Sequence, residues 1–517
     1  MLTRHLPLAL ASATLFVGTL EPAAAQPLER RIAAIIARPE FRRSYFGMAF
    51  VDLATGKPVY RLNADKFFVP GSTTKVPTAA TALELLGADY RFRTKVYRTG
   101  SVVDGTLQGD LVLVASGDPN LSGRVRPNGT MAFRDTDHSY GSAVEDLVDG
   151  NPLGPLQRLA EQIKAAGVRR IDGRVMVDVS MFKEGDREGG TGVVLSPMVL
   201  NDNLIDVVVR AGDREGAPAS LYPTVPTGYL RLVNEITTGA RGSPRSTSFA
   251  DDRQNSDGTR TVTVRGSIPL GGDGMMPYRV PAPSRFAELA LTEVLQAAGI
   301  VARPRLQEDV VDARQLRPLY TADRQVAEHV SPPMTEVVKI ILKVSQNLHA
   351  STMPYVLGAV AGGNMVAGFR RMGEWERAAG LDLTGQSQGD GAGGVAHFTP
   401  DFMAALLAHM ATRPGFQAFR DALPVLGKDG TLAMIQVNSP AAGHVRAKTG
   451  TFGEPNFVTG GTLVNGKGLA GYIDTKAGRR LAFAIYINNT PVATSAEIQE
   501  VVGQAIGEIA AQVWETR

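Results

Sequence analysis

Cysteine is absent from this chain of 517 residues. Its absence excludes disulfides, iron–sulfur clusters, thiolate zinc sites and a cysteine nucleophile. Histidine is scarce, with seven residues, and the chain has neither a His-Glu-x-x-His motif nor any other close histidine pair, which leaves a metallohydrolase poorly supported. We therefore predict no metal and no cofactor, and any nucleophile must be a group other than a thiol.

The chain also has little net charge and almost no long apolar run. Lys and Arg exceed Asp and Glu by only three, without a basic run interleaved with aromatics, so no nucleic-acid partner is expected. The one apolar stretch, Leu6 to Leu20, follows Arg4, precedes Ala23-Ala24-Ala25, and is shorter than the roughly 18–20 residues that span a bilayer. We predict a signal peptide over residues 1–25, cleaved after Ala25, rather than an N-terminal anchor. The mature chain is then an exported, periplasmic protein without a membrane span, and the lack of cysteine suits that compartment.

The remaining residues indicate an α+β protein of two or three domains. Strand patterns at 46–53 and 59–62 precede a helical pattern at 72–86, and a hairpin pattern at 469–488 precedes a final amphipathic helix. We expect these two ends to join one antiparallel sheet with helices packed on it. Between them, short strand-like runs alternate with Gly-, Pro- and Asp-rich turns. The predicted division is a discontinuous catalytic domain of residues 26–90 and 320–517, called here the body, and an inserted β-rich part of residues 91–319, called the insert.

Ser72-Thr73-Thr74-Lys75 has the form Ser-x-x-Lys at the beginning of the helical pattern. This spacing places Lys75 one turn after Ser72 on the same helix face, so its amine reaches the hydroxyl and takes the proton if the site lowers the lysine pKa. Ser180-Met181-Phe182-Lys183 also fits the form, but there the serine ends a strand and a loop follows. Alone, the first motif is equally explained by Ser72 acting as an ordinary helix cap.

Two more motifs carry side chains suited to the same chemistry. Ser345-Gln346-Asn347 lies where two helical patterns meet, and its serine would relay a proton to a leaving group while its amide binds a peptide. Lys448-Thr449-Gly450-Thr451 would receive a carboxylate on a strand beside the Ser72 helix, where the glycine lets a substrate backbone approach. Each also has a plain structural interpretation, as helix caps and as a solvated turn.

In this order, the three motifs resemble the set found in penicillin-binding proteins and related serine β-lactamases. Ser345 follows Ser72 by 273 residues, and the class C enzymes similarly place large extra domains between these motifs. The chain thus resembles the low-molecular-mass class C penicillin-binding proteins, the D-alanyl-D-alanine carboxypeptidase/endopeptidase family. Further matches cover nearly all of the mature chain: Leu107-x-Gly109-Asp110-Leu111, Gly117-Asp118-Pro119-x-Leu121, Asn201-Asp202-Asn203, Asp429-Gly430-Thr431-Leu432 and Gly471-Tyr472.

The resemblance implies the transpeptidase-like fold of these proteins and acyl transfer at D-Ala-D-Ala type bonds of peptidoglycan stem peptides. Ser72 is then the nucleophile, Lys75 the general base and Ser345 the proton relay. The backbone N–H groups of Ser72 and Thr451 would form the oxyanion hole. β-Lactam antibiotics mimic the same carbonyl and would acylate Ser72. The resemblance assigns substrate binding to Asn347, Lys448, Thr449, Gly450 and Thr451.

Two alternatives stay open beside the D,D-peptidase: a serine β-lactamase of the same fold, and a non-catalytic cell-wall binding protein. The large separation of the first two motifs disfavours the former, and the intact motifs disfavour the latter. The chain departs from the family pattern at residues 390–395, where Asp-Gly-Ala-Gly-Gly-Val replaces Asp-Gly-Ser-Gly-Leu-Ser and loses both hydroxyls. Carboxypeptidase and endopeptidase activity are both compatible with the motifs, since both cut the same bond type.

Overall fold

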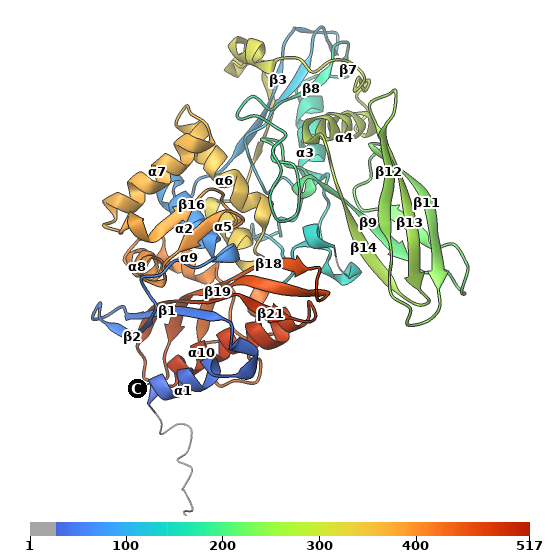
Figure 1. Cartoon of the computed structure of the whole chain (residues 1–517). Coiled ribbons are helices and arrows are strands. Elements are labelled where there is room, and N and C mark those ends of the chain that lie inside the picture. The colour runs from blue at the N-terminus through green and yellow to red at the C-terminus, as the bar shows by residue number, and fades with distance from the viewer. Residues whose placement is uncertain (1–26, 142, 517) are drawn as a thin grey trace, which may run out of the picture.

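The structure is a computed structural model that describes residues 27–141 and 143–516. The signal peptide predicted over residues 1–25 lies outside this range. Within the described part, no helix is both long and apolar enough to cross a membrane. The chain forms a sheet-containing body and, beside it, the insert, which runs from light blue through cyan and green to yellow-green in Figure 1.

One antiparallel sheet organises the body. Its strands follow the order β18-β19-β20-β1-β2, with β21 paired to β19. Strand β1 pairs with β20 from Tyr45 opposite Asn488 to Asp52 opposite Leu481, which confirms that the two ends of the chain share one sheet. The hairpin predicted at 469–488 is confirmed by the pairing of β19 with β20. The strand bounds are β1 Tyr45–Asp52, β2 Pro58–Leu62, β18 Val445–Asn456, β19 Gly461–Asp474, β20 Arg480–Asn488 and β21 Thr490–Val492.

Both faces of this sheet are buried, and alternate residues of β20 serve different cores. Phe483 and Ile485 pack with helices α1 and α10 on one face. Ala484 and Tyr486 pack on the other face with α2, α5, α6 and α8. This two-residue alternation explains the continuous apolar run of β20. The helix bounds of the body are α1 Leu28–Ile36, α2 Lys75–Leu86, α5 Met334–Lys343, α6 Asn347–Val360, α7 Met365–Ala378, α8 Pro400–Met410, α9 Phe416–Asp421 and α10 Gln504–Trp514.

The insert is built from small sheets around a separate apolar core. Its sheets have the orders β15-β3-β6-β8, β10-β9-β14, β11-β13-β12 and β4-β5-β7. Its helices are α3 (Gly154–Ala165) and α4 (Pro283–Ala297). The strand bounds are β3 Arg93–Arg98, β4 Val102–Val103, β5 Thr106–Leu107, β6 Leu111–Val114, β7 Arg170–Ile171, β8 Val175–Asp178, β9 Leu204–Arg210, β10 Ser220–Pro223, β11 Leu230–Gly239, β12 Ser248–Gln254, β13 Arg260–Pro269, β14 Asp273–Arg279 and β15 Gln325–Val330.

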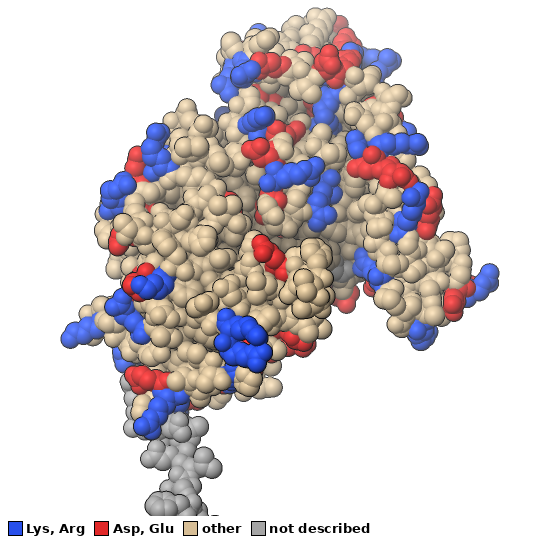
Figure 2. All heavy atoms as spheres, in the orientation of Figure 1, with Lys and Arg blue, Asp and Glu red and all other residues tan. Residues whose placement is uncertain are grey.

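The α+β class is confirmed, and two details differ from expectation. Strand β15 follows residue 320 in the chain but pairs with β3 of the insert. The helical pattern from Thr335 through Leu357 contains Pro354, and a proline there predicts a helix break. Helix α6 instead continues through Pro354, and the helical pattern is interrupted earlier, between Lys343 and Asn347. A short pair, β16 (Gln386–Gln388) with β17 (Ala396–Phe398), completes the body. On the face shown in Figure 2, basic and acidic side chains lie interspersed over the insert.

Candidate active site

Ser72 lies at the amino end of α2, within the single 3₁₀ turn Gly71–Thr74 that leads into the helix. Gly71 has a φ of +52°, and a Cβ there would lie 2.5 Å from the Thr451 nitrogen. A Cβ on Gly450 would lie 2.0 Å from the Pro70 carbonyl oxygen. Glycine at both positions therefore allows strand β18 to lie directly against the turn that carries Ser72.

Lys75 reaches Ser72 as the motif spacing predicts. Its Nζ lies 2.7 Å from Ser72 Oγ, and it donates to Asn347 Oδ1 at 2.6 Å. The lysine is completely buried, and this burial lowers its pKa to about 8, although the nearby Glu188, Asp137 and Asp390 oppose the shift. A pKa in this range gives a sizeable unprotonated fraction near neutral pH, which a general base requires.

The Asp390 loop supplies a further acceptor to Lys75. The Asp390 carboxylate accepts hydrogen bonds from the backbone of Ala392 at 2.8 Å and of Val395 at 2.6 Å, and thereby folds the loop around itself. The Ala392 carbonyl oxygen then accepts from Lys75 Nζ at 3.2 Å. Because the contact is made by the backbone, it does not need the hydroxyl that this chain lacks at residue 392.

Ser345 and Asn347 occupy the junction between α5 and α6. Ser345 has a φ of +69°, a left-handed conformation that turns the chain between the two helices and brings this residue to the same pocket as Ser72. The Asn347 carboxamide is used at both ends: its Oδ1 accepts from Lys75, and its Nδ2 donates to the Tyr140 hydroxyl at 3.0 Å. Tyr140 belongs to the insert, so the insert contacts the catalytic motif directly.

Strand β18 carries the third motif along one wall of the pocket. Thr449 and Thr451 line the pocket, and Thr449 Oγ1 donates to Thr431 Oγ1 at 2.7 Å. The Lys448 ammonium is fully buried and donates to the carbonyl oxygen of Thr449 at 2.7 Å. Burial, together with the positive charges of Lys75 and Lys467, holds the Lys448 pKa well below its ordinary value.

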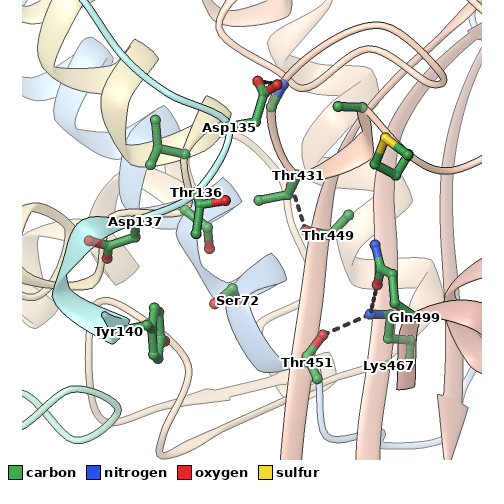
Figure 3. A pocket seen from close by; sticks show the side chains of 15 residues that line it. Ser72, Asp135, Thr136, Asp137, Tyr140, Thr431, Thr449, Thr451, Lys467 and Gln499 are labelled. Carbon is green, nitrogen blue, oxygen red and sulfur yellow. Dashed lines mark hydrogen bonds between the residues drawn. The ribbon is translucent and has the colours of Figure 1, made fainter. Parts of the chain in front are cut away.

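The pocket between these elements has a volume of about 490 Å³. Figure 3 shows Ser72 between the β18 threonines on one side and Asp137 and Tyr140 of the insert on the other. Among the described residues, no group of three or more His, Asp or Glu side chains is arranged to hold a metal ion. The arrangement places the Ser72 hydroxyl beside a buried amine, at a cleft whose lining includes hydroxyls, a lysine and two carboxylates.

Sequence reasoning missed a third lysine in this cleft. Lys467 lies on β19 opposite Thr451, lines the pocket and donates to Thr451 Oγ1 at 2.9 Å and to Gln499 Oε1 at 3.0 Å. Burial lowers its pKa to about 8, and no carboxylate is among the partners that the described part of the chain gives it. One sequence signal could have located Lys467. It lies two residues before the predicted hairpin that begins at Leu469, and pairing this extended strand with the Lys448–Thr451 strand places it opposite Thr451.

The insert residues at the pocket, Asp135, Asp137 and Tyr140, were also missed. They lie on an irregular segment whose only regular element near the pocket is the single 3₁₀ turn His138–Tyr140. Asp135 Oδ1 accepts from the Gly430 nitrogen at 2.5 Å, which ties this segment to the body. No periodicity or motif spacing marks such residues, because tertiary packing alone brings them to Ser72.

Comparison with known proteins identifies the family to which the chain belongs. The model of the D-Ala-D-Ala carboxypeptidase 3 (S13) family matches residues 28–513. The chain belongs to this family. The resemblance to class C penicillin-binding proteins drawn from the motifs is thereby confirmed, and S13 membership assigns serine D-Ala-D-Ala carboxypeptidase chemistry to the chain.

Individual relatives agree with the S13 assignment. The chain is 27% identical to the D-alanyl-D-alanine carboxypeptidase of Actinomadura sp. (strain R39), over 98% of this chain and 89% of that protein. It is 22% identical to D-alanyl-D-alanine carboxypeptidase DacB of Haemophilus influenzae, over 82% of this chain and 81% of the relative. The crystal structure of penicillin binding protein 4 from the same organism superposes with a TM-score of 0.68 at 17% identity, covering 93% of this chain and 98% of that one, and so shares the fold.

Proposed function

We propose that this S13 enzyme cleaves D-Ala-D-Ala type bonds of peptidoglycan stem peptides through a Ser72 acyl-enzyme. The observation that carries the proposal is the buried Lys75 amine, 2.7 Å from Ser72 Oγ, with a pKa lowered to about 8. A serine hydroxyl is a weak nucleophile without a base, and this lysine is within reach to accept its proton. The same serine would be acylated by penicillin.

The proposed reaction has two acyl-transfer steps. Ser72 Oγ attacks the carbonyl carbon of the scissile bond while its proton passes to Lys75. The tetrahedral oxyanion is stabilised by the backbone N–H groups of Ser72 and Thr451, near the positive end of helix α2. Collapse breaks the C–N bond, and Ser345 relays a proton to the departing D-alanine amine. A water molecule then attacks the ester, releases the shortened peptide and restores the Ser72 hydroxyl.

Substrate binding is assigned to the β18 wall and to Asn347. Asn347 would orient the peptide backbone, and Gly450 would let it approach the strand. The terminal carboxylate would bind the Thr449 and Thr451 hydroxyls in the field of Lys448. Because Lys448 donates to the Thr449 carbonyl while Lys467 lines the pocket, we add Lys467 as a second cation for this carboxylate.

We also propose a division of the chain and a location for the enzyme. The catalytic domain comprises residues 26–90 and the segment after β15, while the insert extends to residue 330 because β15 completes its sheet. Carboxypeptidase activity on free stem peptides and endopeptidase activity on cross-links use the same bond type, and we propose both. Peptidoglycan is the substrate polymer, and we place the mature enzyme in the periplasm after cleavage behind Ala25.

The test uses the purified full-length mature chain. Wild type is expected to form a long-lived covalent adduct with fluorescent penicillin and to release D-alanine from a pentapeptide, whereas Ser72→Ala is expected to do neither. Labelling that persists in Ser72→Ala would refute the nucleophile assignment. Rapid hydrolysis of a chromogenic cephalosporin without a lasting adduct would instead identify a β-lactamase. Digestion of cross-linked peptidoglycan, read by mass, separates the two peptidase activities.

A further inference from the structure

The motif Asn201-Asp202-Asn203 forms a strained turn at the centre of a buried polar cluster. Its three residues have φ values of +48°, +56° and +56°, and all three are buried. Asn and Asp tolerate this left-handed conformation better than other side chains with a Cβ, but three in succession carry a conformational cost. The surrounding structure must therefore stabilise the turn.

The Asp202 carboxylate binds partners from both parts of the molecule. Its Oδ1 accepts from His349 Nε2 of helix α6 at 2.8 Å. Its Oδ2 accepts from His138 Nε2 and Arg124 Nη1, both of the insert, at 2.8 and 2.6 Å. Although burial opposes ionisation, Arg124 and the two histidines hold the Asp202 pKa well below its ordinary value. One ionised carboxylate thus bridges the insert and the body.

His138 is fixed from both sides of its ring. Nδ1 lies 2.9 Å from Asp206 Oδ1, and Nε2 lies 2.8 Å from Asp202 Oδ2. Carboxylates only accept hydrogen bonds, so both ring nitrogens carry protons and the ring is an imidazolium. In agreement, the nearby carboxylates raise the His138 pKa to about 10 against the effect of burial. The ring therefore holds a single orientation.

The two histidines that bind Asp202, called here the arms of the bridge, each lie two residues from a partner in the Tyr140–Asn347 hydrogen bond, called here the catalytic contact. His138 is followed two residues later by Tyr140, and Asn347 precedes His349 by two residues. The Tyr140 hydroxyl accepts from Asn347 Nδ2 at 3.0 Å. Tyr140 is 57% exposed, so core packing does not fix its ring, and its position depends on the short turn that begins at the buried His138.

We propose that Asp202 is a positioning residue for the active site. By binding His138 and His349 together, it holds Tyr140 against Asn347. Asn347 in turn keeps its carboxamide oxygen on Lys75, 2.6 Å from Nζ, and the base stays directed at Ser72. The insert is then part of the catalytic apparatus: its docking, transmitted through one carboxylate, sets the geometry of the nucleophile's base. This inference rests on the proposed function of Ser72 and Lys75.

Other contacts keep the insert docked when the bridge is weakened. Leu348 packs against an apolar group of the insert consisting of Val193, Leu195, Val199 and Leu204. Gln346 Nε2 also donates to Asp137 Oδ1 at 3.2 Å. We therefore expect Asp202→Asn, which replaces one acceptor oxygen by a donor and removes the charge, to fold and to loosen the catalytic contact rather than to undock the insert.

The experiment measures acylation of the full mature chain by penicillin G in rapid mixing, so that the limiting acylation rate and the noncovalent dissociation constant are obtained separately. Asp202→Asn and Tyr140→Phe are each expected to lower the limiting rate roughly 5- to 10-fold with the dissociation constant unchanged. In the double variant the effects should not multiply, because both act through the same contact, and its rate should match Tyr140→Phe alone within about twofold.

A matched control is Asp178→Asn. Asp178 is likewise a buried carboxylate of the insert, accepting from Tyr320 and from the Ser180 nitrogen, but it lies outside the pocket lining. It should lose thermal stability without losing acylation rate. His349→Leu removes one arm of the bridge but leaves the His138 ion pairs, and should slow acylation to an intermediate extent.

Three results would overturn the inference: a wild-type acylation rate in Asp202→Asn, full multiplication of the two effects in the double variant, or an equal slowing in Asp178→Asn. Failure of the wild type itself to be acylated would refute the proposed function and this inference together. The wild-type trace therefore distinguishes the two failures. Should Asp202→Asn not fold, a wild-type rate in His349→Leu would decide against the bridge.

Discussion

The two sides of the pocket differ in charge and in architecture. The body contributes three buried lysines, Lys75, Lys448 and Lys467, together with the hydroxyls of β18 and Ser72. The insert contributes Asp137, Tyr140 and Asp135 from an irregular segment (Figure 3). In the proposed mechanism, the body supplies the reacting and anion-binding groups, whereas the insert supplies negative charge and an orienting contact.

This contrast shows how the insert acts on chemistry that it does not perform. Burial alone would lower the Lys75 pKa further, but Glu188 and Asp137 of the insert oppose it through their charge. In the proposed mechanism, the insert therefore influences the pKa of the base as well as its direction. Variants on the two sides should consequently have different signatures: loss of reaction on the body side, and shifted pH dependence or slower acylation on the insert side.

The largest expected effect is on the body side, at Lys75. In Lys75→Arg the guanidinium keeps its proton at all accessible pH values, so it cannot serve as the base. The limiting acylation rate should fall roughly 10³-fold or more. Stopped-flow mixing with fluorescent penicillin measures the rate, and circular dichroism checks the fold. A rate within tenfold of the wild type would remove Lys75 from the role of general base.

The next effect is the pH dependence of acylation, which compares both sides in one experiment. As the proposed base, Lys75 can accept the Ser72 proton only when it is unprotonated, and burial lowers its pKa to about 8. The acylation rate should therefore rise roughly 50-fold from pH 6 to pH 8 and level off above that. Asp137→Asn removes a negative charge that raises the Lys75 pKa, so the midpoint should move to lower pH.

The Asp137→Asn variant suits this comparison because, within the described part of the chain, only one of the two Asp137 carboxylate oxygens accepts hydrogen bonds. Oδ1 accepts from the Ser139 nitrogen and from Gln346, whereas Oδ2 has no partner among the described residues. An asparagine amide can take the place of Oδ2 with the other contacts kept. A midpoint that moves to higher pH would contradict the assigned electrostatic role of the insert.

A smaller effect is expected for Lys467→Met, again on the body side. Removing this cation should lower the preference for a peptide ending in a carboxylate over the same peptide amidated by roughly 10-fold, because one charge-assisted contact is lost. Release of the terminal residue from both peptides gives the ratio. Lys476→Met, at an exposed turn of the β19–β20 hairpin, is the control. An unchanged ratio would leave carboxylate recognition to Thr449, Thr451 and Lys448.

The smallest predicted effect concerns Thr431→Val. The Thr449 hydroxyl donates to Thr431 Oγ1 at 2.7 Å, and valine removes that acceptor without changing the side-chain volume greatly. Loss of one neutral hydrogen bond should lower kcat/KM for D-alanine release roughly 3-fold. Thr412→Val, which loses an exposed hydroxyl outside the pocket lining, should leave kcat/KM unchanged. A loss above 100-fold would place Thr431 in direct contact with the reacting atoms.

The body and the insert also differ in how much of their pocket lining could be predicted from the sequence. Ser72, Lys75, Ser345 and Asn347 lie on or beside helices, so fixed spacing along the chain becomes fixed spacing in space. Lys467 lies on a strand, two residues before the predicted hairpin, and its position opposite Thr451 depends on the cross-strand pairing of β18 with β19. Local patterns alone therefore did not single out this lysine.

The pocket residues that come from the insert were harder to predict from the sequence. Tyr140 reaches Asn347 only because two separately folded cores dock against each other, and no local pattern encodes that contact. Pro354 shows the opposite error, in which a sound local rule predicted a helix break. Helix α6 tolerates this proline within a closely packed environment, where Gly368 lies against its carbonyl oxygen.

The pairing of β1 with β20 joins segments from the two ends of the chain. Paired residues of these strands are at least 429 positions apart in the chain. During synthesis, β1 and β2 emerge first and can form only a two-stranded hairpin, which is marginal by itself. The insert has all its strands long before the sheet can close. A chain truncated before residue 480 would carry all three motifs but lack β20, the strand that joins β1 to β19, and the sheet that places β18 beside the Ser72 turn could not close.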